Sequence, residues 1–71
     1  MSTLADDLAE TLAKDVIAHI DATGDEDVIK IITTALGERS QTLEEAFVTA
    51  VRVIRAERRA REILQNRPPA T

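Results

Sequence analysis

Apolar residues recur with the period of an α-helix along the first part of the chain. Leucine, valine and isoleucine stand at every fourth position, with further small or aliphatic residues beside them: Leu4, Leu8, Leu12, Val16 and Ile20, then Ala5, Ala9, Ala13 and Ile17. This spacing places them on one broad stripe of a helix. The sequence therefore predicts a helix over about residues 4–21, capped at its start by Thr3. Gly24 follows as a stop signal, because glycine accepts the left-handed backbone conformation at a helix end.

A second, shorter apolar stretch covers about residues 26–36. Its members follow helical spacing: Val28, Ile29, Ile31, Ile32, Ala35 and Leu36. Most of these side chains are β-branched, which is also typical of a strand. We expect a helix, because a lone strand would have no pairing partner in this chain. In addition, Asp25 is placed to cap such a helix and Gly37 to end it.

The third stretch, about residues 43–66, predicts a long helix. Thr42 followed by Glu45 has the form of a capping box, and the proline pair at 68–69 prevents continuation. One face of this helix begins apolar: Leu43, Ala46, Phe47, Ala50, Val51 and Ile54. Further along, the same face carries charged side chains: Glu57, Arg58 and Arg61. We therefore expect the helix to leave the core of its own protomer after Ile54, so that its last turns project into solvent or cross another chain.

Together these segments predict an all-α fold, a small three-helix domain over residues 1–66 in which a helical hairpin is followed by a longer third helix. Residues 67–71 are expected to form a disordered tail. With 71 residues, one aromatic side chain and no cysteine, the core is small and carries no disulfide. Such a core rarely supplies more than about 3–5 kcal/mol of net stability without a staple or a partner. We therefore expect a homodimer in which the third helices, or the first and third, pack together, with Ile63 and Leu64 extending the apolar signal.

Charge is divided unevenly along the chain. Residues 1–38 carry nine acids and two lysines, a net charge of −7, whereas residues 39–71 carry seven arginines and four acids, a net charge of +3. The two halves together give the formal net charge of −4. We expect the halves to attract each other, within one fold or across a dimer, or else to face two different partners.

Five arginines lie within ten positions of the predicted third helix. At about 100° per residue they encircle the helix rather than forming one stripe. Glu57 is spaced to pair with Arg61, and Glu62 with Arg58. The single aromatic residue, Phe47, belongs to the apolar face, so no aromatic side chain is left to stack on a base. We expect a partner-binding surface made of the arginines and two aliphatic residues: Arg52, Arg55, Arg58, Arg59, Arg61, Ile63 and Leu64.

Residues 32–47, ITTALGERSQTLEEAF, have the outline of a helix-turn-helix. The apolar, apolar, glycine and apolar positions of that motif are filled by Ile32, Leu36, Gly37 and Leu43. Over these sixteen residues the chain resembles the bacterial repressor and antitoxin helix-turn-helix families. The resemblance implies a DNA-binding transcriptional regulator or an antitoxin-like protein. The chain departs from the pattern at three acidic positions, where carboxylates replace an apolar residue or would face phosphates and base acceptors: Glu38, Glu44 and Glu45.

Other candidate chemistry is sparse. The acidic stretch 21–27 lacks the glycine and the glutamate that an EF-hand calcium loop needs at its sixth and twelfth positions. We therefore expect no metal site. His19, the only histidine, follows Asp15 by one helical turn, a spacing typical of a surface pair. We expect no catalytic residue and no cofactor, and we predict that the protein is not an enzyme.

The sequence thus favours a small, non-enzymatic interaction or regulatory protein that self-associates and acts through a helix face. We expect a cytoplasmic location, because no apolar run exceeds three residues, which is too short for a membrane span or a signal-peptide core. A DNA-binding regulator using residues 32–47 is the alternative. A third possibility is an acidic nucleic-acid mimic that inhibits a DNA- or RNA-binding partner through the acids of the first helix.

Overall fold

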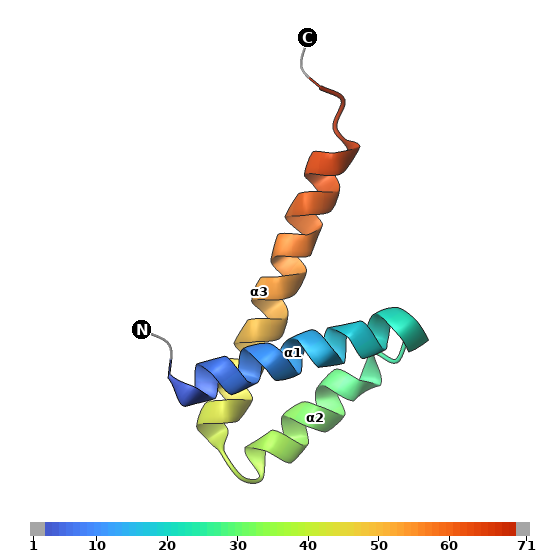
Figure 1. The fold of residues 1–71 in the computed structure, drawn as a ribbon. Coiled ribbons are helices and arrows are strands. Elements are labelled where there is room, and N and C mark those ends of the chain that lie inside the picture. Colours follow the sequence, from blue (N-terminus) through green and yellow to red (C-terminus); the bar gives the residue numbers. More distant parts are fainter. Residues whose placement is uncertain (1–2, 70–71) are drawn as a thin grey trace.

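A computed structural model describes residues 3–69 of the chain, and this part is folded into three helices with no strand (Figure 1). The helices are α1 (Leu4–Thr23), α2 (Asp27–Gly37) and α3 (Gln41–Asn66). The predicted all-α class is therefore confirmed. Of the expected tail, residues 67–69 lie beyond α3 without regular structure, while residues 70–71, like residues 1–2 of the expected domain, lie outside the described range. In that range no helix combines the length and the apolar character needed to cross a lipid bilayer.

Helix α1 begins and ends where its sequence signals lie. The Thr3 hydroxyl accepts a hydrogen bond from the backbone N–H of Asp6 at 3.1 Å, and the Asp6 carboxylate accepts one from the backbone N–H of Thr3 at 3.3 Å. This reciprocal capping box satisfies two N–H groups that the first turn leaves unpaired. At the other end Gly24 adopts φ 75°, and its N–H bonds to the carbonyl of Ile20 at 2.7 Å. Both predicted signals are confirmed.

The other two helix starts differ from the prediction. Helix α2 begins after Glu26, which makes no side-chain cap, and the predicted cap residue Asp25 instead bonds the ring of His19 at 3.0 Å. Helix α3 begins at Gln41 because Ser40, held in an extended conformation, accepts a hydrogen bond from the N–H of Leu43 at 3.1 Å. The predicted capping box of Thr42 and Glu45 is therefore wrong.

The α2–α3 turn is also tighter than expected. Gly37 remains inside α2 as its last residue, and among the described residues a positive φ occurs at Gly24 and nowhere else. Gly37 was expected to end the helix, and α2 does end there, although without the left-handed conformation that Gly24 adopts. Its missing side chain serves a different purpose, because the Glu44 carboxylate lies where a Cβ would stand. The three residues 38–40 then suffice to reverse the chain.

The core lies where α3 crosses α1. The fully buried or nearly buried side chains come from these two helices: Ala9, Ala13, Val16, Ile17, Ile20, Phe47 and Val51. Phe47 has no exposed surface and packs in the same cluster as Ala9 and Ala13, whose small side chains leave room for its ring. Helices α1 and α2 run antiparallel across a short turn (Figure 1), yet each packs more extensively on α3 than on the other. Helix α3 is thus the element that holds the fold together.

Helix α3 extends beyond the core, as predicted. Ile54 is half-buried, and every described residue after it is exposed. The helix is about 39 Å long at about 1.5 Å per residue, and its distal half rises clear of α1 and α2 (Figure 1). The Cα radius of gyration is 14.6 Å, whereas a compact domain of this length has a radius of about 11 Å. We call residues 55–66 the arm.

Candidate functional site: α3 and its arm

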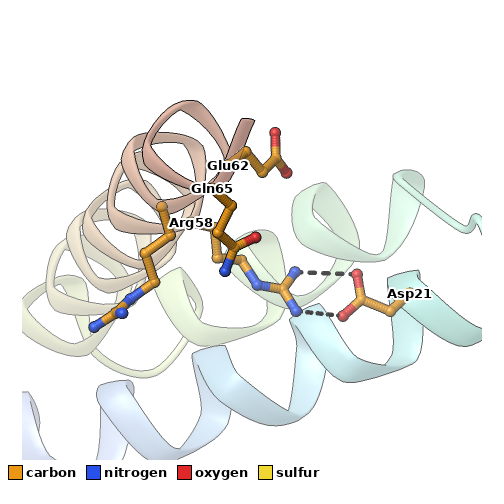
Figure 2. A pocket seen from close by; sticks show the side chains of 5 residues that line it. Asp21, Arg58, Glu62 and Gln65 are labelled. Atoms are coloured by element: carbon orange, nitrogen blue, oxygen red, sulfur yellow. Dashed lines mark hydrogen bonds and ion pairs between the residues drawn. The ribbon is translucent and has the colours of Figure 1, made fainter. Parts of the chain in front are cut away.

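Two ion pairs tie the base of the arm to the last turn of α1 and to the residue that precedes α2. The guanidinium of Arg58 donates to both carboxylate oxygens of Asp21, at 3.1 and 2.6 Å (Figure 2). Arg55 donates to both oxygens of Glu26, at 3.0 and 2.9 Å. Each pair joins the acidic half of the sequence to the basic half. One of the two expectations from the charge asymmetry, attraction within one fold, is therefore confirmed.

The bidentate pair of Arg58 and Asp21 changes the ionisation of both groups. The hydrogen bonds from Arg58 hold the pKa of Asp21 below its ordinary value, and those to Asp21 raise the pKa of Arg58. Both side chains remain about half exposed, at 48% and 50%. Water and salt therefore screen the attraction, so the pair orients the arm more than it stabilises the fold.

The remaining arginines of the predicted surface are also engaged along α3. Arg61 pairs with Glu57, as predicted, and Arg59 donates to Glu62 at 3.3 Å. The predicted pair of Glu62 with Arg58 does not form, because Arg58 turns to α1 instead. Of the five arginines of the predicted surface, all within the described residues 3–69, Arg52 is the one without an ion pair. The cluster is therefore less basic toward a partner than its sequence indicates.

An open cleft of about 400 Å³ lies where the arm meets α1. It is lined by charged and amide side chains of both elements: Asp21, Arg58, Arg61, Glu62 and Gln65 (Figure 2). Two arginines and two carboxylates balance in charge around it, and one of each, Arg58 and Asp21, forms the bidentate pair described above. The cleft is therefore an ionic contact region between the arm and the end of α1.

The two aliphatic members of the predicted surface are open to solvent. Leu64 is 72% exposed and Ile63 is 47% exposed, both on the last turns of the arm. Nothing in residues 3–69 covers them, because the core ends at Ile54. Their role in binding a partner remains a prediction.

The structure adds a groove that the sequence reasoning missed. It lies between the start of α1 and the first half of α3, measures about 340 Å³, and is lined by Asp6, Glu10, Ala46, Thr49, Ala50, Val53 and Ile54. Its floor is apolar and belongs to α3, whereas the rim supplied by α1 is acidic. Val53, in this groove, is 61% exposed.

The groove and the arm share one uncharged stripe of α3. Its members alternate at spacings of four and three residues along the side opposite Phe47: Thr42, Ala46, Thr49, Val53, Ala56, Ala60 and Ile63. We call this set the outer stripe. The spacing was visible in the sequence, but the apolar face containing Phe47 is richer in large side chains and dominated the prediction.

The sequence also raised three other kinds of site: a histidine pair, a metal site and a DNA-reading helix. His19 pairs with Asp25 rather than with Asp15, and both partners are nearly half exposed. Within the described range no group of three or more potential metal ligands comes together. The helix-turn-helix outline does correspond to two helices joined by a short turn, but the first turns of α3 carry two acids: Glu44, whose carboxylate lies against Gly37, and Glu45. Glu45 accepts a hydrogen bond from Gln41 at 3.4 Å and is exposed.

The chain matches no protein-family model, and no curated protein or solved structure shows significant similarity to it.

Proposed function

We propose that this protein is a small, non-enzymatic interaction or regulatory protein that self-associates and acts through one face of α3, the outer stripe. The cytoplasmic location remains the expectation from the sequence. The single observation that carries the proposal is the length of α3: its second half has no core to cover, yet it retains an uncharged stripe ending in exposed aliphatic side chains. A long helix that is bare on one side is typical of a surface that another helix covers.

The charge pattern supports protein contact over nucleic-acid contact. A DNA-binding surface needs arginines that are free to neutralise phosphates. Here Arg55 and Arg58 form ion pairs with carboxylates of the same chain, and the start of α3 is acidic. These observations favour a helix-face partner over the DNA-binding alternative.

Two equally exposed aliphatic residues allow a matched test of the surface. Val53 lies in the groove of α3 and is 61% exposed, while Ile31 lies on α2 and is 62% exposed. We expect Val53→Glu to shift the protein from dimer to monomer, since a carboxylate in an apolar contact is strongly unfavourable. Ile31→Glu should leave the dimer intact. Both variants should keep the helical circular-dichroism spectrum of the wild type, because both positions are on the surface.

Light scattering coupled to size-exclusion chromatography, run over a range of protein concentrations, reads out the mass of each variant. A monomeric wild type, or equal association of the Val53→Glu and Ile31→Glu variants, would contradict the proposed surface.

A further inference from the structure

The groove and the arm lie on two halves of one helix face. The groove occupies residues 46–54, and the exposed aliphatic end of the arm occupies residues 63–64. The groove is an apolar hollow with one wall supplied by α1, whereas the arm is a bare helix with apolar side chains at its end. A hollow and a ridge at opposite ends of the same helix are complementary when two copies run in opposite directions.

The charges along the two halves of α3 also favour two copies that run in opposite directions. The groove's α1 rim carries the carboxylates of Asp6 and Glu10. The arm together with Arg67 carries five arginines and two glutamates, a net charge of +3. Arg61 lies on the same edge of α3 as Ala50, because eleven residues return the helix to within about 20°. This edge is the one that faces the α1 rim, so an arm laid in the opposite direction brings Arg61 toward the acids of another copy.

We propose that the occupant of the groove is the arm of a second copy of this chain, with the two α3 helices packed antiparallel along their outer stripes. This inference rests on the proposed function, since it specifies how the self-association occurs. A two-fold axis near residue 55 relates the two copies. Each arm therefore fills the other copy's groove, and neither groove stays open to a third copy. Leu64 of one copy then lies near Ala46 of the other, and Ala60 lies near Ala50.

The exposed surface of the chain is large enough for such a contact. Its accessible area is 5611 Å², whereas a compact protein of this mass exposes about 4,400 Å². The excess of about 1,200 Å² exceeds the ~800 Å² that each partner buries in a standard interface. A parallel pairing would instead set groove against groove and arm against arm, which brings together acidic rims at one end and arginines at the other.

The direction of pairing is measurable because the chain has no cysteine, so a single introduced cysteine carries the only spin label. Asn66 is exposed at the end of α3 and lies off the outer stripe. In the antiparallel dimer of Asn66→Cys, the two labelled positions are separated by about 33 Å along the helix axes. In a parallel dimer they would be within about 10 Å, the distance between packed helices.

Double electron–electron resonance on the labelled dimer measures the long separation, and dipolar broadening of the continuous-wave spectrum detects the short one. A distance distribution centred at about 35 Å, which combines the separation along the axes with that between them, supports the antiparallel arrangement. A short distance would overturn it while leaving self-association in place. If the labelled protein and the unlabelled wild type are both monomeric in light scattering, the inference and the proposed function are both overturned.

A charge exchange tests the same arrangement independently of the label. We expect Glu10→Arg and Arg61→Glu each to weaken dimerisation severalfold, and the double variant to recover wild-type association. The matched control combines Glu10→Arg with Arg52→Glu, because Arg52 lies on the opposite edge of α3. Recovery when Glu10→Arg is combined with Arg61→Glu, but not with Arg52→Glu, supports antiparallel pairing. Recovery when Glu10→Arg is combined with Arg52→Glu would indicate parallel pairing and overturn the inference.

Discussion

Phe47 is the residue on which the packing of α3 against α1 depends most. It is the largest side chain that is fully buried, and the other buried members of its cluster are alanine or branched aliphatic residues: Ala9, Ala13, Val16, Ile20 and Val51. Removing the ring leaves a cavity in this cluster, because a packed core relaxes only partly around a deleted side chain. Substitution of a buried phenylalanine by alanine costs about 3–5 kcal/mol. That cost is comparable with the net stability of about 3–5 kcal/mol that a core of this size supplies without a partner.

We therefore expect Phe47→Ala to be largely unfolded at 25 °C and Phe47→Leu to remain folded with a free energy of unfolding lower by about 1–2 kcal/mol. Urea titration followed by circular dichroism at 222 nm measures both, at one fixed protomer concentration because a dimer's stability depends on it. Ile31→Ala, at an exposed position, is the control and should change the free energy of unfolding by less than about 0.5 kcal/mol. A loss below 1 kcal/mol for Phe47→Ala would refute the packing described here.

Two further predictions concern the acid dependence of folding and the start of α3. Because Arg58 holds the pKa of Asp21 below its ordinary value of 3.8, the pair stabilises the folded state above about pH 4 and this contribution disappears as the pH falls through the lowered pKa. The difference in unfolding free energy between wild type and Asp21→Asn should therefore shrink in acid, and a difference that is constant from pH 7 to pH 2 would contradict the ion pair. Ser40→Ala should lower the free energy of unfolding by about 1 kcal/mol through loss of the α3 cap, whereas Thr42→Ala should have little effect; the reverse order in urea titration would place the cap at Thr42.

Much of the fold could be predicted from local patterns. The helical period of α1, its Thr3 cap and its Gly24 stop are each properties of a few neighbouring residues, and all three are confirmed. The exit of α3 from the core after Ile54 was also predictable, because charged residues replace apolar ones on a single helix face. The start of α3 was not, because Ser40 and Thr42 are both good cap residues and the choice depends on how tightly the turn closes around Gly37.

The candidate site was less predictable because it depends on tertiary contacts. Arg58 had a carboxylate one helical turn away in Glu62, and only the crossing of α3 over α1 brings Asp21 within reach instead. The groove likewise requires α1 to lie beside α3, so that Asp6 and Glu10 form its wall. The outer stripe was present in the sequence, but small residues such as Ala56 and Ala60 give a weak apolar signal until the structure leaves them exposed.

The most direct test of the central claim is sedimentation equilibrium of the wild-type protein at low and high salt, with a DNA duplex of arbitrary sequence in a parallel cell. Self-association through an apolar helix face predicts a dimer at both salt concentrations that does not sediment with the DNA. Binding through free arginines predicts a steep loss of DNA affinity as salt rises. A monomer that sediments with DNA at low salt and releases it at high salt would therefore contradict the proposed function and favour the DNA-binding alternative.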